Sequence, residues 1–188
     1  FTGEWTKYMK NSNAFPNAKY LMIEGNQDHL SALEEVGEQI AIMLVGDEDE
    51  KEVPYYRSNG NWQTQTGNSI FLESSSQFQE NFSVEMRKTY TVDTILSYLN
   101  LSHTKMDIFK IDVQGSELLV LRGAERLIKA YEPVILTEAS IVPFNTGGPS
   151  FFEMHVYMES IGYVIADIVE QHVSTITFVM RMDIVVLL

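Results

Sequence analysis

The feature that most constrains the fold is a short apolar run, Met106 to Val113, with two charged residues near its carboxyl end. The run is rich in β-branched and aromatic residues, which is typical of a buried strand of a parallel sheet covered on both faces. Lys110 and Asp112 share one face of it, and charges are costly in a core unless they are paired or face a cleft. In an open α/β sheet that cleft lies outside the carboxyl ends of the strands. We therefore expect Lys110 and Asp112 to face such a cleft.

The residues after this strand predict a βαβ unit. Gly115 permits a tight turn, and Ser116 can cap a helix from Glu117 to Ala130 that carries an apolar stripe at three- and four-residue spacing. A second apolar strand, Pro133 to Thr137, ends in Glu138. The unit therefore carries carboxylates at two strand ends.

These residues also carry a resemblance to a known family. The stretch K-I-D-V-Q-G-S-E-L-L-V-L-R-G-A, followed by a P-x-I-x-x-E strand, resembles the signature of the FkbM-type methyltransferases. The family usually has Glu where this chain has Gln114. The resemblance implies an α/β, Rossmann-like methyltransferase fold with a mostly parallel central sheet, an antiparallel last strand and helices on both faces. It also implies S-adenosylmethionine as the cofactor.

The composition limits the classes of partner. The length of 188 residues suits one α/β domain, and the 45% hydrophobic content is that of a globular protein. The net charge of −13 argues against nucleic acid or an anionic membrane surface, since both attract basic patches. There is no Cys, and no apolar run approaches the ~20 residues of a membrane span. We expect a soluble, cytoplasmic protein; the resemblance implies a small-molecule or glycan substrate, and no pattern fixes an oligomeric state.

The start of the chain carries the first cofactor candidate. Glu4 to Asn11 is amphipathic and predicts a helix. In the resembled family a D-x-G-A-x-x-G strand end and a G-x-x-T segment lead into this helix, and Gly3 and Thr6 match the end of that pattern. Glycines there let the cofactor's carboxylate and ribose approach the helix N-terminus. We expect the first strand and most of the glycine-rich loop to be missing from the sequence.

The next strand and helix carry two further candidates. Lys19 to Ile23 predicts a strand, and Glu24 at its end is placed to accept both ribose hydroxyls of a nucleotide. The alternative for Glu24 is a solvated strand-end carboxylate. Asn26 can cap the helix expected from about Gln27 to Val36, and it joins Glu24 as a cofactor-binding candidate.

A third strand is predicted from Gln39 to Val45, followed by an acidic run. By resemblance, Asp47 contacts the adenine of the cofactor. The rest of the run, Glu48 to Glu52, is expected to be a solvated turn.

The segment 58–82 is crowded with Ser, Asn, Gln, Thr and Gly. It is too long for a bare connection in a compact domain, which favours a functional loop or added antiparallel strands. We predict an inserted polar flap or hairpin that faces the substrate. The alternative is a mobile surface insertion.

The remaining elements complete a single domain over 1–188. Strands are predicted over 53–57, 84–90, 164–169 and 177–188, and helices over 92–99 and 151–161. Phe152, Val156 and Ile161 are expected to face inward from the second of these helices. Asp93, in the first turn of the helix at 92–99, is explained by the helix dipole and has no catalytic role. The last strand is expected to insert antiparallel to its neighbours.

The chemistry of methyl transfer assigns roles to the carboxylates. The methyl group of a sulfonium is already activated, so the enzyme mainly aligns the reacting atoms. A hydroxyl acceptor also needs a general base or a metal ion. Asp112 and Glu138 are the catalytic candidates for this step, and Asp112 is also a cofactor-binding candidate. Lys110 is the third catalytic candidate, either paired with Asp112 or orienting the substrate.

A metal is not predicted, although two carboxylates on adjacent strand ends could hold a divalent cation. No convincing third ligand comes from the histidines considered, which are His103, His155 and His172.

The function that the resemblance implies is O-methylation of a hydroxyl on a sugar or secondary metabolite. A non-catalytic Rossmann-like binding module is one alternative, which loss of ribose or adenine contacts would favour, but Glu24 and Asp47 are present. A nicotinamide-dependent oxidoreductase is another, and it would need a full G-x-G-x-x-G after the first strand and a parallel last strand.

Overall fold

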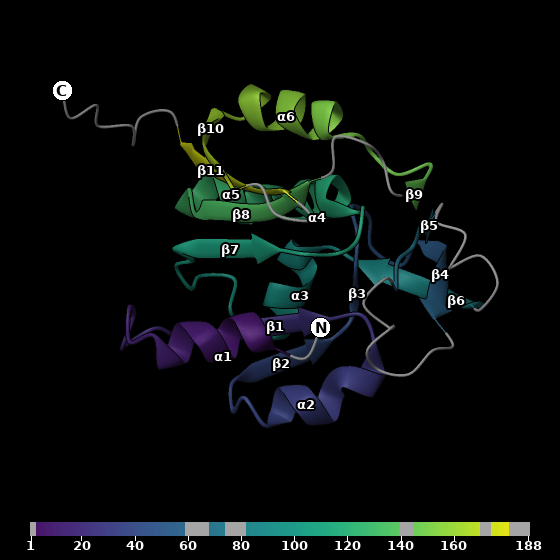
Figure 1. The fold of residues 1–188 in the computed structure, drawn as a ribbon, viewed down its shortest axis with the longest axis horizontal. Coiled ribbons are helices and arrows are strands. Elements are labelled where there is room, and N and C mark those ends of the chain that lie inside the picture. Colours follow the sequence, from purple (N-terminus) through teal and green to yellow (C-terminus); the bar gives the residue numbers. More distant parts are fainter. Residues whose placement is uncertain (1–2, 59–67, 74–81, 140–144, 170–173, 181–188) are drawn as a thin grey trace. The chain divides into compact units, whose positions relative to one another are not determined.

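The computed structural model describes residues 3–58, 68–73, 82–139, 145–169 and 174–180 (Figure 1). Contacts divide the chain into two compact units, a first unit of residues 1–45 and a second unit of residues 46–188. Each unit combines helices with a parallel pair of strands, as an α/β class requires. The single domain expected from the sequence stays a prediction.

In its described residues, the first unit contains a parallel pair of strands, a third short strand, two α-helices and a 3₁₀ helix. Its elements are α1 (Glu4–Asn11), β1 (Leu21–Glu24), the 3₁₀ helix η1 (Gln27–His29), α2 (Leu30–Glu34), β2 (Gln39–Ile42) and β3 (Leu44–Val45). β1 pairs with β2 in parallel, from Leu21 opposite Gln39 to Glu24 opposite Ile42. Its buried core is formed by Met22, Leu33 and Val36, with Ile40 and Ile42 packed against them.

Two elements of the first unit differ from the sequence prediction. The helix expected from Gln27 to Val36 begins as a 3₁₀ turn and is α-helical over only five residues. The strand expected from Gln39 to Val45 is interrupted at Met43, whose N–H donates to the Glu24 carbonyl at 2.9 Å.

The second unit is organised around a four-stranded sheet in the order β10-β11-β8-β7. Its strands are β7 (Ile108–Ile111), β8 (Val134–Ala139), β10 (Tyr163–Val169) and β11 (Ser174–Met180). β7 and β8 are parallel, while β11 lies between β8 and β10 and is antiparallel to both (Figure 1). The predicted antiparallel last strand is therefore confirmed over 177–180, although it begins three residues earlier than predicted, at Ser174; residues 181–188 lie outside the described part.

This sheet is mixed, and it does not show the mostly parallel arrangement expected from the resemblance. Two of its three pairings are antiparallel. The reason is that β10 and β11 are neighbours in sequence joined by a short connection. A parallel pairing would require a crossover of a dozen or more residues, as β7 and β8 have.

Further strands lie before, within and after the polar segment 58–82 in the sequence. β4 (Glu52–Ser58) and β6 (Phe82–Tyr90) form a long antiparallel pair, with Glu52 opposite Lys88. β5 (Leu72–Glu73) pairs antiparallel with β9 (Asn145–Thr146). Most of the segment lies outside the described residues, and the substrate-facing flap stays a prediction.

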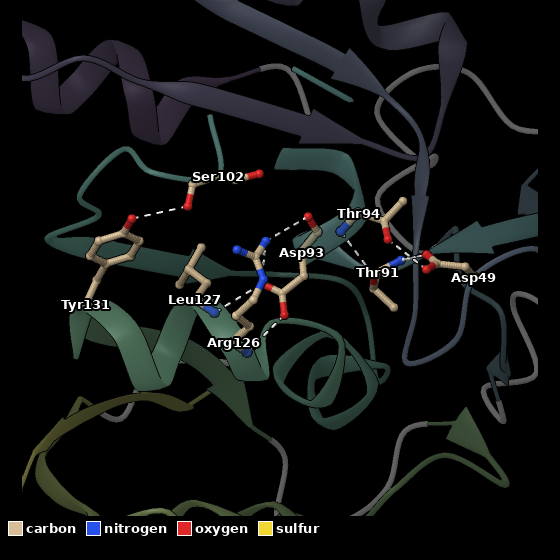
Figure 2. A network of polar contacts seen from close by, with 8 residues as sticks. All are labelled: Asp49, Thr91, Asp93, Thr94, Ser102, Arg126, Leu127 and Tyr131. Carbon is tan, nitrogen blue, oxygen red and sulfur yellow. Dashed lines mark hydrogen bonds and ion pairs between the residues drawn. The ribbon is translucent and has the colours of Figure 1, made fainter. Parts of the chain in front are cut away.

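The helix predicted from Glu117 to Ala130 is wrong in one respect, because it is two helices. α4 (Glu117–Gly123) ends at Ala124, and α5 (Glu125–Tyr131) starts again there. The cause is Asp93 on α3 (Val92–Tyr98), whose carboxylate accepts from the N–H of Arg126 at 2.9 Å and of Leu127 at 3.1 Å (Figure 2). Asp93 thus satisfies the free N–H groups at the start of α5 from another helix.

The acidic run before β4 is exposed, as predicted, and it also caps α3. Asp49 accepts from the Thr91 N–H and from the Thr94 hydroxyl, each at 2.7 Å (Figure 2). Thr91 caps the same helix by accepting from the Thr94 N–H at 3.1 Å, as its place in the sequence predicts. Glu50, two residues before β4, forms an ion pair with Lys88 of β6.

The inward face predicted for α6 (Phe151–Ser160) is wrong. Phe152 is 71% exposed and Val156 is 47% exposed, whereas Met154 and Met158 are buried. Met154 and Met158 are four residues apart and form one stripe, which lies two positions out of phase with the predicted one.

Replacing Asp93 by alanine is expected to lower the free energy of unfolding by about 1–2 kcal/mol, because two N–H groups at the start of α5 lose their acceptor. Chemical denaturation monitored by circular dichroism measures the change. Asp107→Ala is the matched control, since Asp107 pairs with Lys105 where both side chains are 71% exposed. Equal effects of the two substitutions would contradict the capping role.

Candidate functional site

The second unit brings together Lys110, Asp112 and Glu138. β7 and β8 are in parallel register with Ile111 opposite Thr137, so the next step along both chains sets Asp112 beside Glu138. The Nζ of Lys110 lies 2.9 Å from Oδ2 of Asp112. Lys110 therefore pairs with Asp112, which is one of the two roles expected for it, and the three charged groups gather at the carboxyl ends of adjacent parallel strands.

The two carboxyl groups of this site have opposite pKa shifts. Burial acts to raise the pKa of Asp112, but the Lys110 charge and hydrogen bonds from Lys110 and Gln114 outweigh it, so the pKa lies below its ordinary value. Burial, followed by the negative charge of Asp112, raises the pKa of Glu138 to about 7, although Lys110 acts in the other direction. Near neutral pH, Asp112 is therefore ionised, while Glu138 is present in both its protonated and its ionised form. This separation of pKa values distinguishes the roles available to the two groups.

The turn after β7 holds Asp112 from its other side. Gln114 has a left-handed backbone with φ of 55°, followed by Gly115 with φ of 97°. The Nε2 of Gln114 donates to Oδ1 of Asp112 at 3.2 Å. An ionised glutamate, the residue that the resembled family usually has here, could not donate this hydrogen bond.

Glu117 shapes the same turn from the start of α4. It is buried, and its Oε1 accepts from the N–H of Gly115 at 3.0 Å and of Val113 at 3.3 Å. Burial raises the pKa of Glu117 although these backbone hydrogen bonds act to lower it. The cap predicted for Ser116 is wrong: its hydroxyl donates to the Val113 carbonyl at 3.2 Å and makes no cap hydrogen bond.

Glu24 and Asn26 lie in the first unit, in the turn after β1. The Oε1 of Glu24 accepts from the Asn26 N–H at 2.7 Å. Asn26 is buried, and its Oδ1 accepts from the Asp28 N–H at 3.1 Å, which is the predicted cap. A carboxylate fixed at the end of a strand is a suitable acceptor for the hydroxyls of a ribose.

His29 is a residue of this turn that the sequence analysis missed. Its side chain is buried, with Nε2 at 3.2 Å from Nδ2 of Asn26. Burial lowers the pKa of His29, so the neutral ring can accept the hydrogen bond of the Asn26 amide. A single His in Q-D-H-L carries no pattern that would have identified it.

Gly3 occupies the N-cap position of α1 with φ of 77°, a conformation that favours glycine. A Cβ there would lie 2.9 Å from Cγ2 of Val36 and 3.2 Å from Cδ2 of Leu33, so packing also excludes a side chain. Gly3 has no side chain that could cap the first N–H groups of α1. Such a helix N-terminus suits a carboxylate, and with Glu24 it gives the first unit polar groups that fit S-adenosylmethionine.

Asp47, the residue expected to contact adenine, belongs to the second unit. Its Oδ1 lies 3.4 Å from Nζ of Lys51, and its side chain is 26% exposed. The adenine contact stays a prediction, as do the cofactor roles of Gly3, Glu24, Asn26 and Asp112.

Ser69 and Gly123 are two further residues that the sequence analysis did not single out. Ser69 is buried, and its hydroxyl donates to the Gln114 carbonyl at 2.8 Å. Gly123 is buried in the last turn of α4. Ser69 contacts Gln114, and Gly123 lies close to the Gly46 carbonyl. Each contact joins segments far apart in sequence, so no local sequence pattern predicts it.

Among the described residues, no group of three or more Asp, Glu, His or Cys is arranged to hold a metal ion. No helix in the same part of the chain is long and apolar enough to cross a membrane.

Comparison with known proteins agrees with the resemblance. The model of the methyltransferase FkbM domain matches residues 3–165, which is most of the chain. Searches of curated proteins and of solved structures gave no match. The matched range includes both strand-end carboxylates and the turn after β1. The chain therefore belongs to the FkbM methyltransferase family.

Proposed function

We propose that the protein is an S-adenosylmethionine-dependent O-methyltransferase that acts on a hydroxyl group of a sugar or another small metabolite. The observation that carries the proposal is the pair of carboxyl groups at the ends of β7 and β8, in which Asp112 is ionised and Glu138 has a pKa of about 7. A group with a pKa near the working pH is best suited to accept and release a proton.

In this proposal Glu138 is the general base. When ionised, its carboxylate accepts the proton of the acceptor hydroxyl, and Asp112 makes it a stronger base by holding a negative charge beside it. Lys110 keeps Asp112 ionised through their 2.9 Å ion pair. The bound cofactor supplies an activated methyl group.

The first unit supplies the residues that would hold the cofactor. Glu24 would accept from the ribose hydroxyls, and the Asn26–His29 contact at 3.2 Å stabilises the turn that carries it. The N-terminus of α1 at Gly3 would bind the carboxylate of the methionyl part.

Replacing Glu24 by alanine is expected to weaken binding of S-adenosylhomocysteine by ~1–3 kcal/mol, which is roughly a 5- to 150-fold rise in Kd. Isothermal titration calorimetry measures the change, starting from micromolar affinity in the unsubstituted protein. Glu34→Ala, at an exposed position of α2, is the control and should leave Kd unchanged.

Two outcomes would oppose the proposal. If the unsubstituted protein does not bind S-adenosylhomocysteine but binds NADH in a parallel titration, the cofactor assignment is wrong. If Glu24→Ala binds as tightly as Glu34→Ala, then Glu24 does not contact the ribose.

A further inference from the structure

Ser69 joins the polar segment 58–82 to the turn that carries the site. It is 3% exposed and forms a bridge with Tyr56 of β4, through N–H to carbonyl hydrogen bonds of 2.8 and 3.2 Å. Its hydroxyl donates to the Gln114 carbonyl at 2.8 Å and accepts from the Phe71 N–H at 3.1 Å. The hydroxyl therefore acts both as donor and as acceptor, and its donated bond joins two residues 45 positions apart.

The carbonyl that Ser69 holds belongs to a residue in an unfavourable backbone conformation. Gln114 has φ of 55°, which costs a non-glycine residue roughly 1 kcal/mol. The conformation turns the Gln114 side chain toward Asp112, where Nε2 donates to Oδ1 at 3.2 Å. The hydrogen bond from the buried Ser69 hydroxyl to the Gln114 carbonyl stabilises that conformation.

Close packing around Gly115 restricts the turn from a second direction. A Cβ on Gly148 would lie 3.1 Å from the Gly115 carbonyl oxygen and 3.3 Å from Cδ2 of Phe71. The pairing of β5 with β9 brings the segments carrying Phe71 and Gly148 together. The position of Ser69 relative to the turn is therefore fixed by contacts besides its own hydrogen bond.

We propose that Ser69 is a positioning residue of the site, which acts through the main chain of Gln114 to hold the Gln114 amide on the carboxylate of Asp112. This inference rests on the proposed function, because it gives the described part of the 58–82 segment a role in the Asp112–Glu138 pair. Ser69 touches neither carboxyl group in this arrangement. Its effect on the pair is transmitted by two hydrogen bonds in series, at 2.8 and 3.2 Å.

The test is a double-substitution cycle on the titration of the pair. Carboxyl ¹³C NMR follows Asp112 and Glu138 in the unsubstituted protein, in Ser69→Ala, in Gln114→Ala and in the double variant. The Gln114 hydrogen bond lowers the pKa of Asp112, so each single substitution should raise the lower apparent pKa of the pair, by about half a unit. The double variant should titrate like Gln114→Ala alone, because both substitutions break one chain of contacts.

The controls separate positioning from loss of structure. Ser83→Ala, at an exposed position of β6, should leave the titration unchanged. An unchanged titration in Ser69→Ala, or shifts that add in the double variant, overturns the inference. If Ser69→Ala does not fold, Gln114→Ala decides alone: an unchanged lower pKa overturns the inference. The titration needs no cofactor or acceptor, so its result is independent of S-adenosylhomocysteine binding, which tests the proposed function.

Discussion

Replacing Gly123 by alanine is expected to destabilise the protein by about 3 kcal/mol, although alanine is the better helix former. A Cβ at this position would lie 2.1 Å from the Gly46 carbonyl oxygen and 3.3 Å from Cα of Thr91. Both are backbone atoms, so no side-chain rotation can relieve the collision. The last turn of α4 would have to move away from Gly46.

Thermal unfolding measures this effect, and we expect Tm to fall by about 6–12 °C for a chain of this length. Ser97→Ala on α3 is the matched control: the position is exposed, so alanine should gain a few tenths of a kcal/mol from helix propensity. If Gly123→Ala were as stable as the unsubstituted protein, the close approach of α4 to Gly46 would be wrong.

Replacing Glu138 by glutamine is expected to lower kcat by roughly 10²- to 10⁴-fold, because the proposed general base loses its proton-accepting group. The unsubstituted protein should show a rate that rises with pH through about 7, following the pKa of Glu138. That rise should be absent from Glu138→Gln. The measurement is S-adenosylhomocysteine formation against pH, with an acceptor found by screening.

The same substitution has an expected effect on stability that needs no acceptor. The folded-state pKa of Glu138 is raised from 4.5 to about 7, so the stability it contributes is complete below pH 4.5 and is lost as pH rises through about 7. Because water screens a half-buried group, we expect a loss on the order of 1–2 kcal/mol over this window. The pKa of Asp112 is shifted downward, so its own contribution changes below that window.

Denaturation at pH 5 and pH 8 tests this dependence in Glu138→Gln and in the control Glu125→Gln. Glu125 is exposed on α5 and pairs with Lys129. The difference in stability between the two pH values should shrink in Glu138→Gln and should persist in Glu125→Gln. The same dependence on pH in both variants would show that Glu138 does not titrate near 7.

The sequence by itself determined the features that depend on nearby residues and the place of the strand-end charges. Helix α1 has the predicted bounds, Glu4 to Asn11, because amphipathic spacing and the break after it are local signals. Asn26 caps a helix as predicted, and Thr91 caps α3 in the same way, since a cap depends on residues two or three positions away. Lys110, Asp112 and Glu138 meet because parallel strands joined by a helix end at the same edge of a sheet.

Features that depend on distant residues were decided by the tertiary structure. The break between α4 and α5 comes from Asp93, 33 residues away. The buried stripe of α6 follows Met154 and Met158, although apolar residues of the helix also occupy other faces of it. Hydrophobic spacing cannot choose between two apolar faces. The pKa of Glu138 likewise depends on burial and on its neighbour Asp112, and neither is set by residues adjacent to it in sequence. Sequence determined which groups the site contains, and packing decided their ionisation and the turns that hold them.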